Sequence, residues 1–271
     1  MPRDLADVAD YFLPRAAAVQ RAAPDSAAFG SRTPAAARGG RPAALPIVTV
    51  PVGERDVVRA AFVWNLAVEV ARLGASATLI APTPREPSPI WPEAGPGPVG
   101  AEVVLTPADG LAQLHRAALD LAVARAADSA DGGLLLVCVP PAWLGRPVDG
   151  RALLRWVLLF ASTERTDLLE TYGLAKRVLA TSHEARVGVT IHGARRVAEA
   201  QGAFLHLAGV AARYLGRDLA SYGLLVDDLH IYRAIVSQRP IGLEHPQSRA
   251  ARALRDVARL LLEDARKMAL A

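Results

Sequence analysis

From residue 45 onward, short apolar runs alternate with longer stretches in which apolar residues recur at helical spacing. The apolar runs predict strands near residues 47–50, 77–81, 102–105, 134–139, 156–161, 187–191 and 223–226. The stretches between them predict helices near residues 56–73, 109–127, 166–180, 194–215, 229–237 and 247–267. Because strands that alternate with helices usually form a parallel sheet with helices packed on it, this order predicts a doubly wound, mostly parallel α/β fold.

The first 44 residues have a different pattern. Residues 4–23 contain a short helical stretch with one apolar face, made by Leu5, Val8, Ala9 and Phe12. Residues 23–46 are rich in Ala, Pro, Gly and Arg, a composition typical of a flexible linker. We therefore expect two parts: residues 1–44 as a short helix plus linker, and residues 45–271 as one α/β domain. A Pro/Gly-rich insertion is expected at residues 82–100.

The segment 47–83 is the most informative part of the chain. An apolar strand runs into a short polar loop, a helix, Gly74 and a second strand. The end of the helix reads Asn65-Leu66-Ala67 and then Ala71-Arg72-Leu73-Gly74. This unit resembles the MinD/ParA family of deviant Walker ATPases, which are P-loop proteins. The resemblance implies the family's fold and places residues 53–60 on the phosphate-binding loop.

The chemistry that the resemblance implies for this loop is missing. Gly53 is kept, but the family's signature lysine falls on Glu54, its main lysine on Arg59 and its magnesium-binding hydroxyl on Ala60. The loop glycines are replaced by residues with restricted backbones, Arg55, Asp56 and Val58. Glycines allow backbone N–H groups to surround a phosphate, and the carboxylates present here repel one. The loop is therefore expected to be stable without a nucleotide.

Three further family positions are changed. Ala81 stands where the second strand of the family ends in Asp-x-Asp, and Cys138 stands where the Walker B strand carries an aspartate. His192 replaces an asparagine that contacts adenine in the family. We therefore expect a pseudo-ATPase with no catalytic residue, no bound cofactor and no metal ligand. The alternative is an ATP-binding switch that keeps Mg-ATP through altered contacts, with Arg59 pairing with phosphate.

The resemblance extends over residues 45–262. Residues 160–176, FASTERTDLLETYGLAK, are similar to a strand–loop–helix segment of the family, and residues 222–228 to another. Residues 235–252, IVSQRPIGLEHPQSRAAR, are most similar to the flagellar-placement FlhG/FleN branch. The resemblance implies a scaffold or regulator that positions a cellular structure, with flagellar number or placement as the expected role. It also implies a protein partner, either a second copy or a functional MinD- or GTPase-type NTPase.

Composition and charge narrow the picture further. The chain has 271 residues, 52% of them hydrophobic, a single cysteine and no signal-peptide pattern, so we expect a cytoplasmic protein without disulfides. The net charge of +4 resides in residues 15–44, where five arginines face one aspartate. This segment is either a solvated linker or a contact for an acidic partner. Because the rest of the chain is neutral, a nucleic-acid partner is not expected.

Two further expectations concern the C-terminal helix and the other reactive residues. The helix near 247–267 has one apolar stripe but also several acids and no aromatic residue, so we expect it to pack in the core and not on a membrane. The six histidines form no metal-binding motif. Cys138 is expected to be a buried, inert thiol, Trp64 and Trp156 core residues, and Asp227-Asp228 a helix cap.

Overall fold

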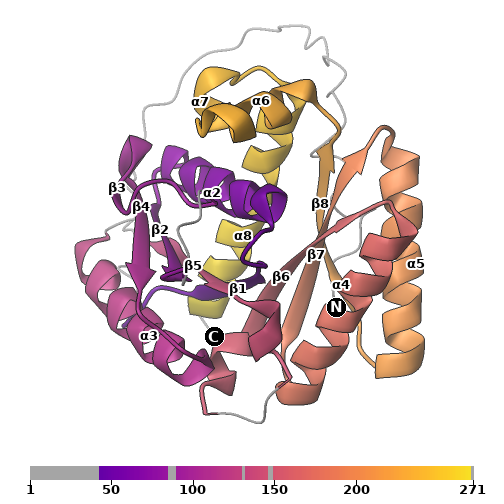
Figure 1. Ribbon diagram of the computed structural model, residues 1–271, viewed down its shortest axis with the longest axis horizontal. Coiled ribbons are helices and arrows are strands. Elements are labelled where there is room, and N and C mark those ends of the chain that lie inside the picture. The colour runs from indigo at the N-terminus through magenta and orange to yellow at the C-terminus, as the bar shows by residue number, and fades with distance from the viewer. Residues whose placement is uncertain (1–42, 85–89, 130–131, 146–148, 270–271) are drawn as a thin grey trace, which may run out of the picture.

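A computed structural model describes residues 43–84, 90–129, 132–145 and 149–269 (Figure 1). The predicted helix and linker of residues 1–44 therefore lie almost entirely outside the described residues. Within these residues the chain forms one eight-stranded sheet of order β3-β4-β2-β5-β1-β6-β7-β8, parallel throughout except for β3. The strands are β1 Ile47–Pro51, β2 Ser76–Pro82, β3 Gly95–Pro96, β4 Ala101–Thr106, β5 Gly133–Val139, β6 Trp156–Ser162, β7 Arg186–Ala194 and β8 Ala220–Val226.

Helices cover both faces of the sheet (Figure 1). They are α2 Val57–Arg72, α3 Leu111–Asp128, α4 Arg165–Thr181, α5 Val197–Leu215, α6 Leu229–Ser237, α7 Ile241–Glu244 and α8 Arg249–Ala269. Helices α2 and α8 pack on each other over one face, and α4 packs beside α5 on the other face, which α3 also covers. The right-handed connections between parallel strands require this division, since β1 to β2 and β6 to β7 advance in opposite directions across the sheet. The predicted doubly wound α/β fold is confirmed.

The core is continuous between the sheet and α8. Leu254, Val257, Ala258 and Leu261 of α8 are buried against the sheet and α2, so the prediction of a core-packing C-terminal helix is confirmed. Trp64 and Trp156 are also buried, as expected. Among the described residues, no helix is long and apolar enough to cross a bilayer.

Besides short 3-10 helices, the described residues add two short segments to the predicted elements. Within the predicted insertion at 82–100, Gly95–Pro96 form the edge strand β3 and pair antiparallel with β4. Gly97 then packs so closely on Trp64 that an added Cβ would lie 2.7 Å from the Trp64 ring. The four-residue helix α7 is the second addition. Neither segment is long enough to show a hydrophobic period, which is why the pattern of the sequence does not reveal them.

A buried carboxylate ties α8 to the sheet. Asp264 accepts a hydrogen bond from the Tyr222 hydroxyl at 2.7 Å and one from Arg186 at 2.9 Å, and its side chain is 2% exposed. Replacing Asp264 with alanine leaves the buried Tyr222 hydroxyl without its acceptor, so we expect a loss of roughly 2–3 kcal/mol in unfolding free energy. Urea unfolding measures this loss. The matched variant Asp128→Ala, at a side chain that is 75% exposed, should change stability by less than about 0.5 kcal/mol.

Candidate functional site at the carboxyl ends of the strands

The loop that follows β1 is closed by the first turn of α2. Asp56 is the N-cap of this helix, and its Oδ1 accepts a hydrogen bond from the backbone N–H of Arg59 at 3.0 Å. A carboxylate at this position satisfies a backbone donor and interacts favourably with the helix dipole. The end of the helix that would face a phosphate in a P-loop protein is therefore capped by the protein itself.

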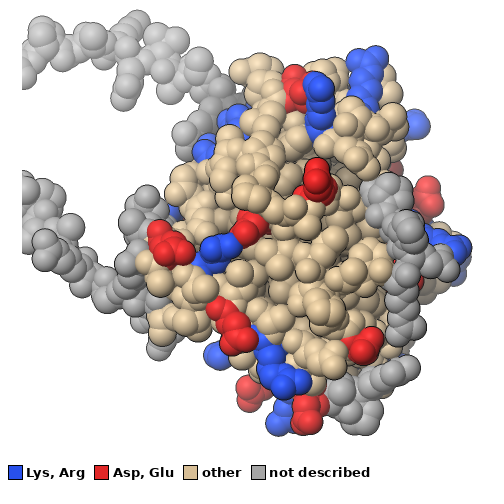
Figure 2. Space-filling view, turned by 60° about the vertical axis from the view of Figure 1, so that its left-hand side comes forward, with Lys and Arg blue, Asp and Glu red and all other residues tan. Residues whose placement is uncertain are grey.

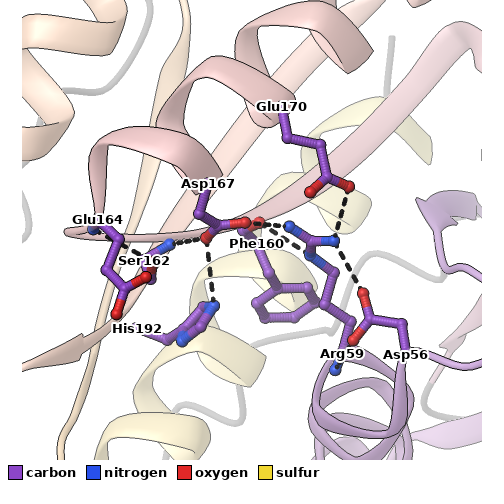
Figure 3. Close-up of polar contacts among 8 residues, drawn as sticks. All are labelled: Asp56, Arg59, Phe160, Ser162, Glu164, Asp167, Glu170 and His192. Atoms are coloured by element: carbon purple, nitrogen blue, oxygen red, sulfur yellow. Dashed lines mark hydrogen bonds and ion pairs between the residues drawn. The ribbon is translucent and has the colours of Figure 1, made fainter.

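Arg59 lies at the centre of an ion-pair network that joins α2 to β6 and α4 (Figure 3). One guanidinium nitrogen lies 2.8 Å from Asp56 Oδ2 and 3.2 Å from Glu170 Oε1. The other bonds to Asp167 Oδ1 at 2.5 Å, and Nε donates to the Phe160 carbonyl at 3.3 Å. The side chain is only 10% exposed. We call Arg59, Asp56, Asp167 and Glu170 the Arg59 network.

The charges of the Arg59 network hold the guanidinium in place. Burial opposes its positive charge, but the carboxylates of Asp56, Asp167 and Glu170 outweigh burial and raise the pKa of Arg59. Asp167 also accepts a hydrogen bond from the backbone N–H of Ser162, which fixes its orientation (Figure 3). The arginine that the sequence resemblance aligns with the family's main lysine is thus directed toward β6 and α4, and each of its side-chain nitrogens is engaged by a protein group.

His192 borders the Arg59 network at the end of β7. Its Nε2 lies 3.8 Å from Asp167 Oδ2, and its ring lies 5.1 Å from the ring of Phe62. Burial lowers the pKa of His192 and Arg59 adds to this effect, although Asp167 acts in the opposite direction. The imidazole is therefore held in its neutral form.

This lowered pKa makes stability depend on pH. As pH falls below the unfolded-state pKa of about 6.5, the unfolded chain binds a proton before the folded chain does. The contribution of His192 is therefore present above that pH and is lost as pH falls through the lower folded-state pKa. We expect His192→Asn to lose less unfolding free energy between pH 8 and pH 5.5 than the wild type. Urea unfolding at the two pH values tests this, and His183→Asn, at an exposed histidine, is the control. If His192→Asn loses as much unfolding free energy as the wild type between these pH values, the expectation is wrong.

Two hollows flank the loop between β1 and α2 at the carboxyl ends of the strands. A cavity of about 740 Å³ lies beside the ends of β2 and β5, and its lining includes Gly53, Glu54, Cys138, Trp91 and Trp143. A second hollow of about 640 Å³ lies over the ends of β6 and β7. The second hollow, which we call the acidic hollow, is lined by Asp56, Val58, Arg59, Ser162, Thr163, Glu164, Asp167, His192, Gly193, Arg195, Glu199, Asp227 and Tyr232.

The positions that the sequence resemblance aligns with the family's magnesium-binding residues are buried and carry no carboxylate or hydroxyl. Ala60 and Ala81 are fully buried. Cys138 lies opposite Val50 in the sheet, is 2% exposed and has its pKa raised by burial, so the thiol stays protonated. The predicted burial of this thiol is confirmed. In the described part of the chain, no three His, Cys, Asp or Glu side chains are grouped so that they could hold a metal ion.

Asp228, another candidate from the sequence, has a structural role. Asp228 is the N-cap of α6 and accepts a hydrogen bond from the His230 N–H at 3.0 Å, which confirms the predicted cap. The sequence prediction missed Asp167 and Glu170, the two acids of α4 that engage Arg59. Their spacing of three residues, one turn apart directly after a central strand, is the signal that could have identified them.

Comparisons with known proteins identify solved structures with a similar fold. No family model matches the chain, and no curated protein matches it. Among solved structures, the MinD cell division protein of Aquifex aeolicus is similar, with a TM-score of 0.54, 13% identity, and coverage of 80% of this chain and 97% of that one. The cell division ATPase MinD of Pyrococcus furiosus is similar with a TM-score of 0.55, 13% identity, and coverage of 80% and 98%.

A third similar structure is the septum site-determining protein MinD of Pyrococcus horikoshii complexed with Mg-ADP, with a TM-score of 0.51, 11% identity, and coverage of 80% and 96%. All three cover nearly their own full length and the same share of this chain. At these identities the likeness concerns the fold. The protein has the fold of the MinD ATPases.

Proposed function

We propose that this protein is a MinD-like pseudo-ATPase, a non-hydrolysing scaffold or regulator in the positioning of a cellular structure. The observation that supports this most directly is the Arg59 network. An arginine that binds phosphate must direct its guanidinium toward the phosphate-binding loop. The side chain of Arg59 is instead 10% exposed and is engaged by three carboxylates and a carbonyl. Releasing it would leave three carboxylates next to one another without their cation.

The residues present do not fit a magnesium nucleotide held as in the family. Ala60 offers no hydroxyl, Ala81 no carboxylate, and Cys138 a protonated thiol in place of a carboxylate. Magnesium requires oxygen ligands, and none of these three side chains supplies one. Asp56 and Glu54 add negative charge where phosphates would be placed, so the charge at the loop opposes an anionic ligand.

The alternative function is a nucleotide-binding switch. The acidic hollow has room for a ligand, and its lining includes the guanidinium of Arg59. The same lining carries five carboxylates, which repel a polyphosphate. This chemistry favours the nucleotide-free scaffold over the switch.

The proposed partner is another protein. Glu54 lies exposed on the loop where the family carries the lysine that reaches into a dimer partner. Two copies facing each other there would bring like charges together, whereas a MinD- or GTPase-type NTPase with its own lysine would present the opposite charge. Nucleic acid is not proposed, because the face shown in Figure 2 has basic and acidic side chains interspersed over a largely uncharged surface.

Flagellar number or placement is the process that we propose, on the basis of the similarity of residues 235–252 to the flagellar-placement branch. Deleting the gene in the source organism and counting flagella per cell, with their positions, by electron microscopy tests this. We expect a changed number or an altered position, restored by the wild-type gene and also by a variant that only alters the exposed Leu205. Flagella that are unchanged in number and position would rule this process out.

A further inference from the structure

Helix α6 presents an apolar stripe to solvent. Leu229, Tyr232 and Val236 recur at spacings of three and four residues and are exposed, Val236 to 86%, while Ile231 and Ala234 on the opposite side are buried. Two valines in the first turn of α2, Val57 and Val58, are also exposed, and Val58 lines the same hollow as Tyr232. We call Leu229, Tyr232, Val236, Val57 and Val58 the α6–α2 surface.

The α6–α2 surface and the acidic hollow adjoin. Tyr232 and Val58 belong to the surface and also line the hollow. The hollow contains five carboxylates, those of Asp56, Glu164, Asp167, Glu199 and Asp227, against the two guanidiniums of Arg59 and Arg195. Two of these five carboxylates, those of Asp56 and Asp167, pair with Arg59. An exposed apolar stripe next to an excess of negative charge fits an occupant that carries an apolar helix followed by basic residues.

The chain itself contains such a segment. Residues 4–12 carry an apolar face at helical spacing, with Asp4, Asp7 and Asp10 spaced onto the opposite face. Residues 15–44, which follow, carry five arginines and one aspartate. We propose that residues 4–44 dock in cis, with the apolar face of residues 4–12 on the α6–α2 surface and the arginines over the acidic hollow. The two features of the segment match the two adjoining features of the surface in chemistry.

The length of chain permits this contact. The described chain enters the sheet at the amino end of β1, whereas the acidic hollow lies at the carboxyl ends of the strands. Just before β1, the Leu45 N–H donates to the Ala122 carbonyl at 3.0 Å. Crossing a strand of seven residues requires about 23 Å, whereas the 29 residues from 14 to 42 can extend to roughly 95 Å. A tether of this kind provides an effective concentration near the millimolar range. A contact of modest intrinsic affinity is then occupied most of the time.

Docking in cis would make residues 4–44 compete with any protein partner that binds the same face. It would cover the face beside the Arg59 network, and a protein partner that uses that face would have to displace it. This regulatory consequence rests on the proposed function, but the docking itself does not. If the nucleotide titration or the flagellar count contradicts the proposed function, the docking of residues 4–44 still stands. Disulfide trapping tests this docking independently of both.

Disulfide trapping in the full chain tests the proposal. The natural Cys138 is buried and protonated, so it does not compete for an introduced thiol. We pair Ala9→Cys with Val236→Cys, and separately with Tyr232→Cys, and compare both with Ala9→Cys paired with Leu205→Cys. Leu205 is exposed on α5, which packs on the face of the sheet opposite α2, whereas α6 contacts α2. Cross-linking under mild oxidant is followed on non-reducing gels at several protein concentrations.

We expect an intramolecular disulfide to form at least roughly tenfold faster in the α6 pairs than in the α5 pair, at a rate independent of protein concentration. Replacing Arg15, Arg21, Arg32, Arg38 and Arg41 with serine should bring the α6 rate toward the α5 rate. Equal rates for the α6 and α5 pairs would overturn the proposal, as would a disulfide-linked dimer that forms in place of the monomeric product. An unchanged rate in the serine variant would overturn the role given to the acidic hollow.

Discussion

Replacing Arg59 with alanine is expected to destabilise the fold by about 3 kcal/mol. The change leaves Asp56, Asp167 and Glu170 close together without the cation that neutralises them, and removing one partner of a buried ion pair typically costs about 3–5 kcal/mol. We expect the lower end of this range because Glu170 is half exposed and water screens part of the repulsion. Chemical unfolding of both proteins at neutral pH measures the difference.

The control for this variant is a surface pair of the same residue types. Arg239 lies 3.3 Å from Glu244, with side chains 67% and 42% exposed, so Arg239→Ala should cost less than about 1 kcal/mol. If Arg59→Ala costs no more than Arg239→Ala, Arg59 is not a structural residue, and the account of the loop fails. A lysine or arginine that serves a ligand would affect ligand binding when replaced and leave the empty fold largely unaffected.

The second large effect is expected at the end of β5. Replacing Cys138 with aspartate places a carboxylate where the side chain is 2% exposed and the neighbouring strand offers Val50, so we expect a loss of roughly 3 kcal/mol or more at pH 8. Burial would raise the pKa of the new carboxyl in the folded state. The penalty should therefore shrink as pH falls toward the unfolded-state pKa of about 3.9, below which the carboxyl is protonated in both states.

Unfolding at pH 8 and pH 5 measures this effect, with Cys138→Ser as the matched polar but uncharged control, expected to cost less at pH 8. Adding magnesium at millimolar concentration should not restore the stability of Cys138→Asp, since Ala60 and Ala81 supply no further oxygen ligands. Recovery of most of the lost stability by magnesium would show that the strand end still forms a metal site. An aspartate variant as stable as the wild type would show that this strand end is open to water.

The sequence was sufficient to predict the seven longer strands and the arrangement of helices around them. Long apolar runs such as residues 134–139 and the stripe of α8 carry a clear period, and the alternation of the two types allows few topologies. The frame of residues 47–83 also predicted the loop between β1 and α2, while the departure of its residues from the family stays a prediction. Strand β3 was missed because two residues, one of them a proline, have no pattern to detect.

The Arg59 network was beyond the reach of the sequence alone. Asp167 and Glu170 lie more than 100 residues from Arg59, and their approach depends on β6 lying next to β1. From the sequence, Arg59 either pairs with phosphate or is a lysine replacement that no longer binds phosphate. Tertiary packing supplied a third role, an internal cation that joins two helices and a strand. The N-terminal docking likewise depends on which side of α6 faces solvent, which only the structure shows.

The central claim is that the MinD-like loop of this protein does not serve a nucleotide. Isothermal titration calorimetry with ATP and magnesium, at nucleotide concentrations up to several millimolar, tests it most directly, alongside an active MinD ATPase under the same conditions. We expect no saturable heat for this protein and no release of phosphate that depends on magnesium. Binding with a Kd in the micromolar range, or hydrolysis that requires magnesium, would contradict it.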